Sequence, residues 1–161
     1  MYYQPIIGTL GFILSADRKK VLMVYRNKRG DDLFLGKYNG LGGKMMPEEN
    51  VKTCMIREIQ EEAGILCTKM QLRGTVNWTG FGPNGEDWLG FIFLIEEYEG
   101  EPWSENVEGS LSFIDIDQLH TLPMWEGDRL FLPLVFDNNP EPFHIHMPYK
   151  EGQPIGFNCT R

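Results

Sequence analysis

The sequence is poor in cysteine and in long apolar runs, and each shortage excludes a class of protein. Its three cysteines, Cys54, Cys67 and Cys159, are odd in number and lack metal-ligand spacing. We therefore expect reduced thiols in a cytoplasmic protein, not a disulfide scaffold or a zinc site. No run approaches the roughly 20 apolar residues that a membrane-spanning helix needs. Residues 1–14 lack the basic region and cleavage site of a secretory signal, so neither a membrane anchor nor a signal peptide is expected.

Positive charge is also scarce. The chain has 15 Lys and Arg against 23 Asp and Glu, a net charge of −8. Proteins that bind nucleic-acid polymers are more often basic, so no such partner is expected. An acidic protein can still bind a small phosphorylated ligand when a divalent cation offsets the repulsion. The length of 161 residues favours a single domain over 1–161, and nothing in it indicates an oligomeric state.

The apolar pattern predicts an α/β fold. Stretches 6–14 and 20–26 are β-prone and flank a polar turn, so they are expected to form a hairpin. Helical spacing is expected near 47–64, in one turn at 115–119, and at 125–136, where Pro133 would kink the helix. Further strands are expected at 67–79, 88–97, 111–114 and 143–149, the last in a terminal hairpin with 155–158. This order favours an α/β sandwich with a mixed sheet.

The most informative stretch runs from Gly43 to Ile65. Glycine tolerates the left-handed conformation of a helix C-cap, so a helix is expected from near Pro47 and Glu48 to Gly64. At about 100° per residue, its last three glutamates project into one arc roughly 100° wide. Carboxylates so close repel each other unless a cation lies among them, and oxygen ligands suit Mg²⁺ or Mn²⁺. These glutamates are Glu58, Glu61 and Glu62.

A solvated acidic helix face is the alternative, because charge runs are usually on the surface. Two features favour the metal site instead. Met55, Ile56, Ile59 and Ala63 form an apolar stripe beside the acids, so one face of the helix is expected to be buried. The glycine-rich segment 39–44 ahead of the helix permits a tight backbone, which can present carbonyls to a metal and amides to an anion.

This stretch resembles the Nudix box, G-(any five)-E-(any seven)-R-E-(aliphatic)-x-E-E-x-G-(aliphatic). Every specified position is filled, by Gly43, Glu49, Arg57, Glu58, Ile59, Glu61, Glu62, Gly64 and Ile65. The resemblance implies a Nudix hydrolase, an enzyme that cleaves a nucleoside diphosphate linked to another moiety. It also implies the Nudix-type α/β/α sandwich, with a central mixed sheet between helices.

The resemblance assigns roles within the box. Glu58, Glu61 and Glu62 would ligate the divalent metal, with the Gly42 carbonyl as a further ligand. Such an ion neutralises phosphate oxygens and lowers the pKa of a water that attacks phosphorus. Glu61 or Glu62 could also accept the proton of that water.

Other acidic and basic residues are expected to support the metal ligands. Glu49 and Arg57 would orient the acids by ion pairing. A metal ligand distant from the box is usual in the family, and we expect Glu108, which precedes a short strand. Its competitors are Glu97, Glu101 and Glu105.

Residues outside the box resemble the MutT-like purine nucleoside triphosphatases. Arg26 and Lys44 are candidates for phosphate contacts. Asn39, Trp125 and Asp128 match base-recognition positions in the branch that hydrolyses oxidised purine nucleotides. A tryptophan face can stack on a purine, while Asp and Asn supply hydrogen bonds to its edge.

This base pocket departs from the branch at one position and has three further candidates. The mammalian-type version carries two adjacent acids after the tryptophan, and Gly127 replaces the first of them. Thr9, Trp78 and Trp88 could line the same pocket, although core packing would equally explain the tryptophans.

The expected function is Mg²⁺-dependent hydrolysis of a (deoxy)nucleoside triphosphate to the monophosphate and pyrophosphate, with an oxidised purine such as 8-oxo-dGTP preferred. Another Nudix pyrophosphatase activity, on ADP-ribose, a dinucleoside polyphosphate or another nucleotide derivative, is the alternative. A non-catalytic nucleotide sensor would require a damaged box. His144 and His146 share one strand face and are expected to be solvated, not to bind zinc.

Overall fold

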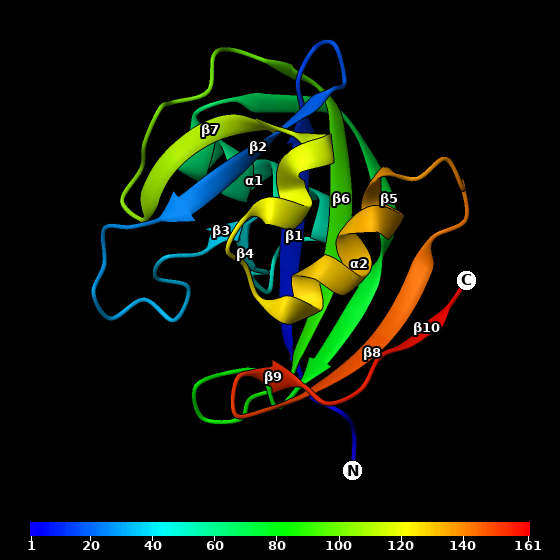
Figure 1. Ribbon diagram of the computed structural model, residues 1–161. Coiled ribbons are helices and arrows are strands. Elements are labelled where there is room, and N and C mark those ends of the chain that lie inside the picture. Colours follow the sequence, from blue (N-terminus) through cyan, green and yellow to red (C-terminus); the bar gives the residue numbers. More distant parts are fainter.

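The computed structural model describes residues 1–161 as a curled mixed sheet with helices on both faces (Figure 1). The strands are β1 (Ile6–Leu14), β2 (Lys20–Arg26), β3 (Tyr38–Asn39), β4 (Leu41–Lys44), β5 (Leu66–Thr79), β6 (Trp88–Glu99), β7 (Gly109–Asp115), β8 (Phe143–Lys150), β9 (Gln153–Pro154) and β10 (Asn158–Thr160). The helices are α1 (Val51–Ala63), the 3₁₀ helix η1 (Ile116–Thr121) and α2 (Glu126–Phe136). The main strand order is β10-β8-β5-β6-β1-β2-β3. The β1–β6 and β5–β8 pairs are parallel and the other pairs are antiparallel.

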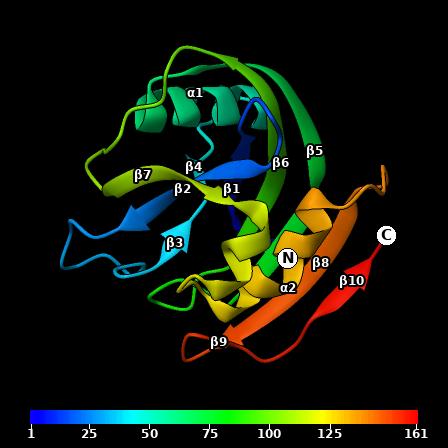
Figure 2. The same ribbon diagram turned by 45° about the horizontal axis from the view of Figure 1, so that its top comes forward.

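Two apolar cores lie on opposite faces of the sheet. Side chains alternate along a strand, so Phe12 and Leu14 of β1 enter the core beneath α2 while Ile13 enters the core beneath α1. Helix α2 contributes Phe131 to the first core, and helix α1 contributes Ile59 to the second. Figure 2 shows the two helices on either side of the sheet. The expected α/β/α sandwich is confirmed.

Helix α1 begins later than the sequence indicated. Asn50 is its N-cap: the Thr53 amide donates to Asn50 Oδ1 at 2.9 Å, and the Asn50 amide donates to Thr53 Oγ1 at 3.0 Å. This reciprocal cap places the first helical residue at Val51, so the predicted start near Pro47 was wrong. The predicted end is confirmed, because Gly64 has a left-handed φ of 71°.

The predicted hairpin of β1 and β2 is correct only beside its turn. The two strands pair at Ile13 with Leu22 and at Leu14 with Val21, and then separate. Strand β4 takes the vacated edge and pairs with β1 over Gly8 to Gly11. Strand β1 therefore pairs with β2 at its C-terminal end and with β4 at its N-terminal half. This arrangement brings residues from the three strands close together.

The remaining elements follow the prediction with shifted ends, except that the strand expected at 155–158 is wrong, because residues 155–157 are irregular and the last strand is β10. Helix α2 continues through Pro133, and β8 turns into β9 before β10 returns along its outer edge. His144 and His146 are exposed on β8, where their rings form hydrogen bonds with the hydroxyls of Thr75 and Thr79 of β5.

None of the helices combines the length and apolar character needed to span a bilayer.

Candidate active site

Arg57 binds most of the acidic side chains of α1. Its guanidinium pairs with Glu49, donates to Glu58 Oε1 at 2.9 Å and to Glu61 Oε2 at 3.2 Å, and reaches the Lys44 carbonyl at 3.1 Å. The hydrogen bonds from Arg57, with one from the Met46 amide, lower the pKa of Glu49 to about 2. Arg57 thus fixes the orientation of Glu49 and Glu58 and compensates their charge. The Glu61 carboxylate is more exposed, at 58%.

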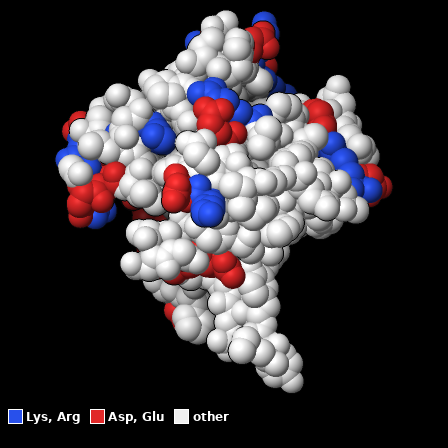
Figure 3. All heavy atoms as spheres, turned by 60° about the horizontal axis from the view of Figure 1, so that its bottom comes forward, with Lys and Arg blue, Asp and Glu red and all other residues white.

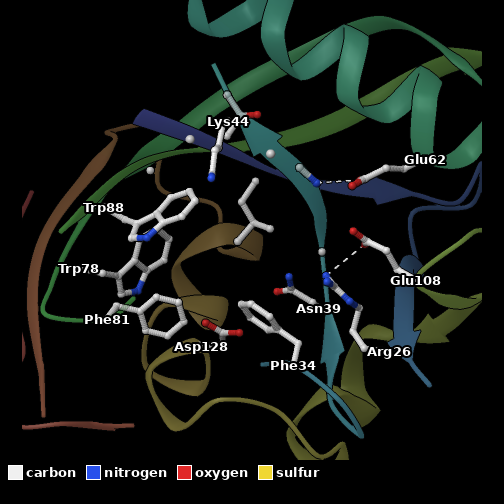
Figure 4. Close-up of a pocket in the computed structure, with 17 residues that line it drawn as sticks. Arg26, Phe34, Asn39, Lys44, Glu62, Trp78, Phe81, Trp88, Glu108 and Asp128 are labelled. Atoms are coloured by element: carbon white, nitrogen blue, oxygen red, sulfur yellow. Dashed lines mark hydrogen bonds and ion pairs between the residues drawn. The ribbon is translucent and has the colours of Figure 1, made fainter. Parts of the chain in front are cut away.

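Glu62 points away from Arg57. Its Oε2 accepts a 2.9 Å hydrogen bond from the Gly42 amide, which joins α1 to β4. Burial raises the pKa of Glu62 to about 9, and the nearby charges of Glu108 and Glu58 add to this shift. Glu108, in the loop before β7, forms an ion pair with Arg26 at 3.2 Å. In Figure 4 the carboxylates of Glu62 and Glu108 lie near each other beside the backbone of β4.

A cavity of about 360 Å³ extends from these two carboxylates. This volume is within the range of small-molecule sites, roughly 300–1,000 Å³. Most residues that the sequence indicated for substrate binding lie in its wall, although they come from six strands and a helix. They are Thr9, Arg26, Asn39, Lys44, Trp78, Trp88 and Asp128.

Two aromatic residues of the cavity wall were missed by sequence reasoning. Phe34 comes from the segment between β2 and β3, and Phe81 from the turn after β5. Phe81 lies 6.3 Å from Trp78 between ring centroids, and Figure 4 shows both rings facing into the cavity. The apolar run Leu33-Phe34-Leu35 within a loop rich in charged residues was the only available signal for Phe34.

Trp125 is placed differently from the other predicted pocket residues. It is not among the residues that line the cavity, and its ring contacts Phe34 and Phe81 at centroid distances of 5.9 and 5.3 Å. The Lys37 ammonium lies 5.1 Å from the Trp125 ring centroid, and the buried indole Nε1 has no hydrogen-bond partner. Trp125 therefore supports the two phenylalanines that face the cavity.

Asp128 brings a titratable group to the aromatic end of the cavity. It lies in the first turn of α2, and burial raises its pKa from 3.8 to about 7. Neighbouring Arg129 opposes this shift only weakly. Near neutral pH this carboxyl exists in both protonation states, so it can donate as well as accept a hydrogen bond.

The arrangement of a glutamate-rich helix beside a polar and aromatic cavity has counterparts among known proteins. A family model described as the NUDIX domain matches residues 6–135. The chain belongs to the Nudix family. It is 34% identical over 127 residues to the Nudix hydrolase YvcI of Bacillus subtilis, covering 76% of this chain and 75% of the relative. It is also 34% identical over 126 residues to the oxidized purine nucleoside triphosphate hydrolase of Danio rerio, covering 78% of each.

Among solved structures, the MutT protein of Bacillus halodurans superposes with a TM-score of 0.80 at 23% identity, over 96% of this chain and 97% of that chain. At this identity the likeness shows the fold alone. The expected Nudix fold and hydrolase class are both confirmed.

Nudix hydrolases generally use divalent metal ions, and the oxygen donors of the box suit a hard cation. Burial is the main cause of the raised pKa of Glu62, and Arg26 is the nearby charge that opposes this shift. As the side chains lie, however, no three acidic, histidine or cysteine residues form a group that could hold a metal. The sequence predicted that the three glutamates converge, but Arg57 holds Glu58 and Glu61 to one side. Arg57 bonds Glu58 through Oε1 and Glu61 through Oε2, so each of these carboxylates keeps a second oxygen without a hydrogen bond from Arg57.

Backbone geometry keeps the glycine loop of the Nudix box close to α1. A Cβ at Gly43 would lie 2.5 Å from the Glu58 carboxyl group, so any other residue would displace this acid from its present position. The Gly42 amide faces Glu62, and Gly42 pairs with Leu10 of β1. A Cβ at Gly42 would collide with the Thr9 carbonyl of β1, so the two glycines answer to different neighbours, the β1 backbone and the Glu58 carboxylate.

The predicted phosphate contacts differ in their availability. The Arg26 guanidinium is bound by Asp32 at 2.8 Å and by Glu108 at 3.2 Å. Lys44 is exposed, and its ammonium lies 5.6 Å from the Trp88 ring centroid. Lys44 is therefore the more accessible cation of the cavity. Thr9 is buried in the wall, with its hydroxyl 3.4 Å from the Cys54 thiol.

A second cavity of about 360 Å³ adjoins the first. The two cavities share Glu62 and Glu108 in their walls. Its lining residues are Lys28, Glu61, Glu62, Trp103, Glu105, Asn106, Val107 and Glu108. Space is thus available on both sides of these carboxylates.

Proposed function

We propose that this Nudix hydrolase converts a (deoxy)nucleoside triphosphate and water to the monophosphate and pyrophosphate with Mg²⁺, and prefers an oxidised purine such as 8-oxo-dGTP. The observation that carries the proposal is the main cavity, which joins a base-sized aromatic end with Asp128 to the carboxylates of Glu62 and Glu108. The Danio rerio relative, an oxidized purine nucleoside triphosphate hydrolase, supports the same substrate class.

The metal would be held by glutamate carboxylates and the carbonyl of Gly42. When bound, Mg²⁺ lowers the pKa of a water molecule and offsets the phosphate charge. Arg57 and Glu49 orient the carboxylates, and Glu61 or Glu62 accepts the proton of the attacking water. Lys44 supplies a further positive charge for the phosphates, and Arg26, which is paired with Asp32 and Glu108, supplies another. The proposed ligands are Glu58, Glu61, Glu62, Glu108 and Gly42.

Base recognition is assigned to the far end of the cavity. The rings of Trp78, Phe81 and Phe34 offer stacking surfaces for a purine. Asn39 and Asp128 supply hydrogen bonds to its edge, and the two protonation states of Asp128 allow it to meet either a donor or an acceptor.

Gly127 explains why no acidic residue directly precedes Asp128. A Cβ at this position would collide with the Tyr149 hydroxyl and the Met147 sulfur, so no second acidic side chain fits here without rearrangement. The base edge is therefore read by Asp128 without an adjacent acid.

A second candidate activity is favoured by the adjoining cavity. Its volume on the other side of Glu62 and Glu108 leaves room for a leaving group larger than pyrophosphate. ADP-ribose or a dinucleoside polyphosphate would place such a group there.

We also propose a cytoplasmic protein without a nucleic-acid polymer as partner. The free thiols of Cys54, Cys67 and Cys159 support a reducing compartment. On the face shown in Figure 3, basic side chains occur in small separated groups beside acidic ones, not as a broad positive surface.

A substrate panel with Mg²⁺ tests the proposal. Oxidised and unmodified purine triphosphates, pyrimidine triphosphates, ADP-ribose and dinucleoside polyphosphates are compared by kcat/KM, with pyrophosphate and orthophosphate measured separately. We expect the highest value for an oxidised purine triphosphate, with pyrophosphate as the product. Turnover of ADP-ribose without triphosphate hydrolysis would instead establish the second candidate.

The Glu61→Gln variant controls for contaminating phosphatases in the panel. It removes a proposed metal ligand from an exposed position, so kcat should fall by about 10²-fold or more while the fold is retained. The exposed Glu99→Gln, which lies away from the cavities, should keep normal turnover. Near-normal turnover of Glu61→Gln would exclude its assigned role.

A further inference from the structure

The segment from Trp103 to Gly109 closes the C-terminal end of α1. The last carbonyls of a helix have no partner within the helix. Here the Trp103 amide donates to the Ala63 carbonyl at 3.0 Å, and Asn106 Nδ2 donates to the Glu62 carbonyl at 2.9 Å. The Trp103 indole packs where a side chain at Gly64 would lie, so glycine is needed beneath it. A loop distant in sequence thus caps the helix that carries the box.

The other half of the Asn106 amide holds the loop itself. Its Oδ1 accepts hydrogen bonds from the Glu108 amide at 2.9 Å and from the Gly109 amide at 3.1 Å. The Asn106 backbone amide donates to the Gly109 carbonyl at 2.9 Å, which completes a tight turn. One side-chain amide therefore connects the main chain of Glu62 directly to the main chain of Glu108.

We propose that Asn106 is a positioning residue that sets Glu108 against Glu62, so that carboxylates from the helix and the loop can bind one divalent ion. This inference rests on the metal-binding roles proposed for these two glutamates. A carboxylate in a metal site must be placed to within about 0.5 Å, and a loop without support does not give that precision. The competing ion pair with Arg26 draws Glu108 toward β2, and Asn106 anchors its main chain to α1.

Manganese binding to the full chain without nucleotide tests this role independently of turnover. The free Mn²⁺ signal in electron paramagnetic resonance gives the dissociation constant for wild type and for Asn106→Ala. Partners that orient metal ligands typically contribute 10- to 100-fold to affinity, so we expect Asn106→Ala to bind Mn²⁺ about 10-fold more weakly. Unchanged affinity would overturn the inference.

Asn27→Ala is the matched control. The Asn27 side chain donates to Ser110 Oγ at 3.2 Å, at the start of the same strand β7, and it contacts neither glutamate. Its backbone hydrogen bond to the Glu108 carbonyl is kept in the alanine variant. We expect the Mn²⁺ affinity of this variant to equal that of wild type. That result would show that the loss in Asn106→Ala comes from the position of Glu108 and not from any lost hydrogen bond in this loop.

Asn106→Ser serves where Asn106→Ala fails to fold, as judged by thermal melting. A serine hydroxyl can still accept from the amide two residues on, as in a local turn, but it is too short to reach the Glu62 carbonyl. This variant therefore removes the link to α1 selectively. We expect a similar loss of Mn²⁺ affinity, and wild-type affinity here would count against the proposal.

A double-mutant cycle shows whether Asn106 acts through Glu108. We expect Glu108→Gln to weaken Mn²⁺ binding, and Asn106→Ala to add little further loss in that background. Losses that multiply would mean that Asn106 acts by another route, which overturns the inference. If the wild type hydrolyses triphosphates but Glu108→Gln binds Mn²⁺ with normal affinity, the role given to Asn106 is wrong and the proposed function still stands. Failure of the wild type in the substrate panel would remove the proposed function without altering the Mn²⁺ result.

Discussion

At the scale of single residues, Asp128 combines a functional position with a cost to stability. Its pKa is about 7 in the folded protein and near 3.8 in an unfolded chain, because burial disfavours the charged form. Between these values the folded state binds more protons than the unfolded state. The free energy of unfolding should therefore fall as the pH rises from about 4 to about 7.

Urea unfolding of wild type and Asp128→Asn at pH 5 and pH 8 measures this effect. Asparagine does not titrate, so wild type should lose stability relative to the variant between the two pH values, by an amount on the order of a few kcal/mol. Other titrating groups contribute equally to both proteins. Parallel pH dependence would show that Asp128 ionises normally and is not buried as described.

The residues of the candidate site differ in how far the sequence could indicate them. Glu58, Glu61 and Glu62 share one helix, and helical periodicity gives their directions to within a turn. The sequence did not predict that Glu58 and Glu61 bond to Arg57 while Glu62 turns the other way and accepts from the Gly42 amide. Phe34, Phe81 and Asn106 lie in loops, whose paths follow from long-range packing and not from local spacing.

At the scale of elements, helix α2 depends on a buried arginine from strand β5. Arg73 is only 2% exposed, and its guanidinium donates to the Leu134 and Val135 carbonyls at the end of α2. It also reaches the Asn139 carbonyl and pairs with Asp137 at 2.9 Å. These contacts hold in place the helix that carries Asp128, although no sequence pattern singled out this arginine.

Removal of the Arg73 guanidinium should destabilise the folded protein. Arg73→Met leaves the helix carbonyls and Asp137 without their buried partner, so we expect the free energy of unfolding to fall by about 3 kcal/mol. Arg18→Met is the surface control, because its pair with Glu96 is long at 3.4 Å and the arginine is exposed. That variant should change stability by about 1 kcal/mol or less. Equal losses in urea unfolding would contradict the role given to Arg73.

The sheet shows a second limit of sequence reasoning at this scale. Strand positions followed from apolar and β-branched runs, and most were confirmed. The replacement of β2 by β4 along β1 was not indicated, because a short glycine-rich segment has no apolar alternation. The pairing of β1 with β4 depends on how the backbone of Gly8 to Gly11 fits against β4.

At the scale of the whole molecule, the two cores and the acidic site are separate. Both cores consist of buried apolar side chains on the two faces of the sheet, and none of the proposed carboxylate ligands belongs to either. Folding should therefore not require the metal. We expect a chelator to abolish turnover while the melting temperature stays close to its starting value.

Calorimetry or circular dichroism with and without EDTA, followed by readdition of Mg²⁺, measures both properties. Activity should return when the ion is restored, because the scaffold persists without it. A large drop in the melting temperature on chelation would mean that the ion is a structural component, as in small metal-dependent domains.

The two adjoining cavities have a consequence for the fate of the products. Glu62 and Glu108 border both spaces, so the proposed cleavage beside them would leave one fragment in each. The two product fragments of that reaction would then depart through separate openings, and neither would have to wait for the other. If one fragment left its cavity slowly, the other fragment could still leave the second cavity.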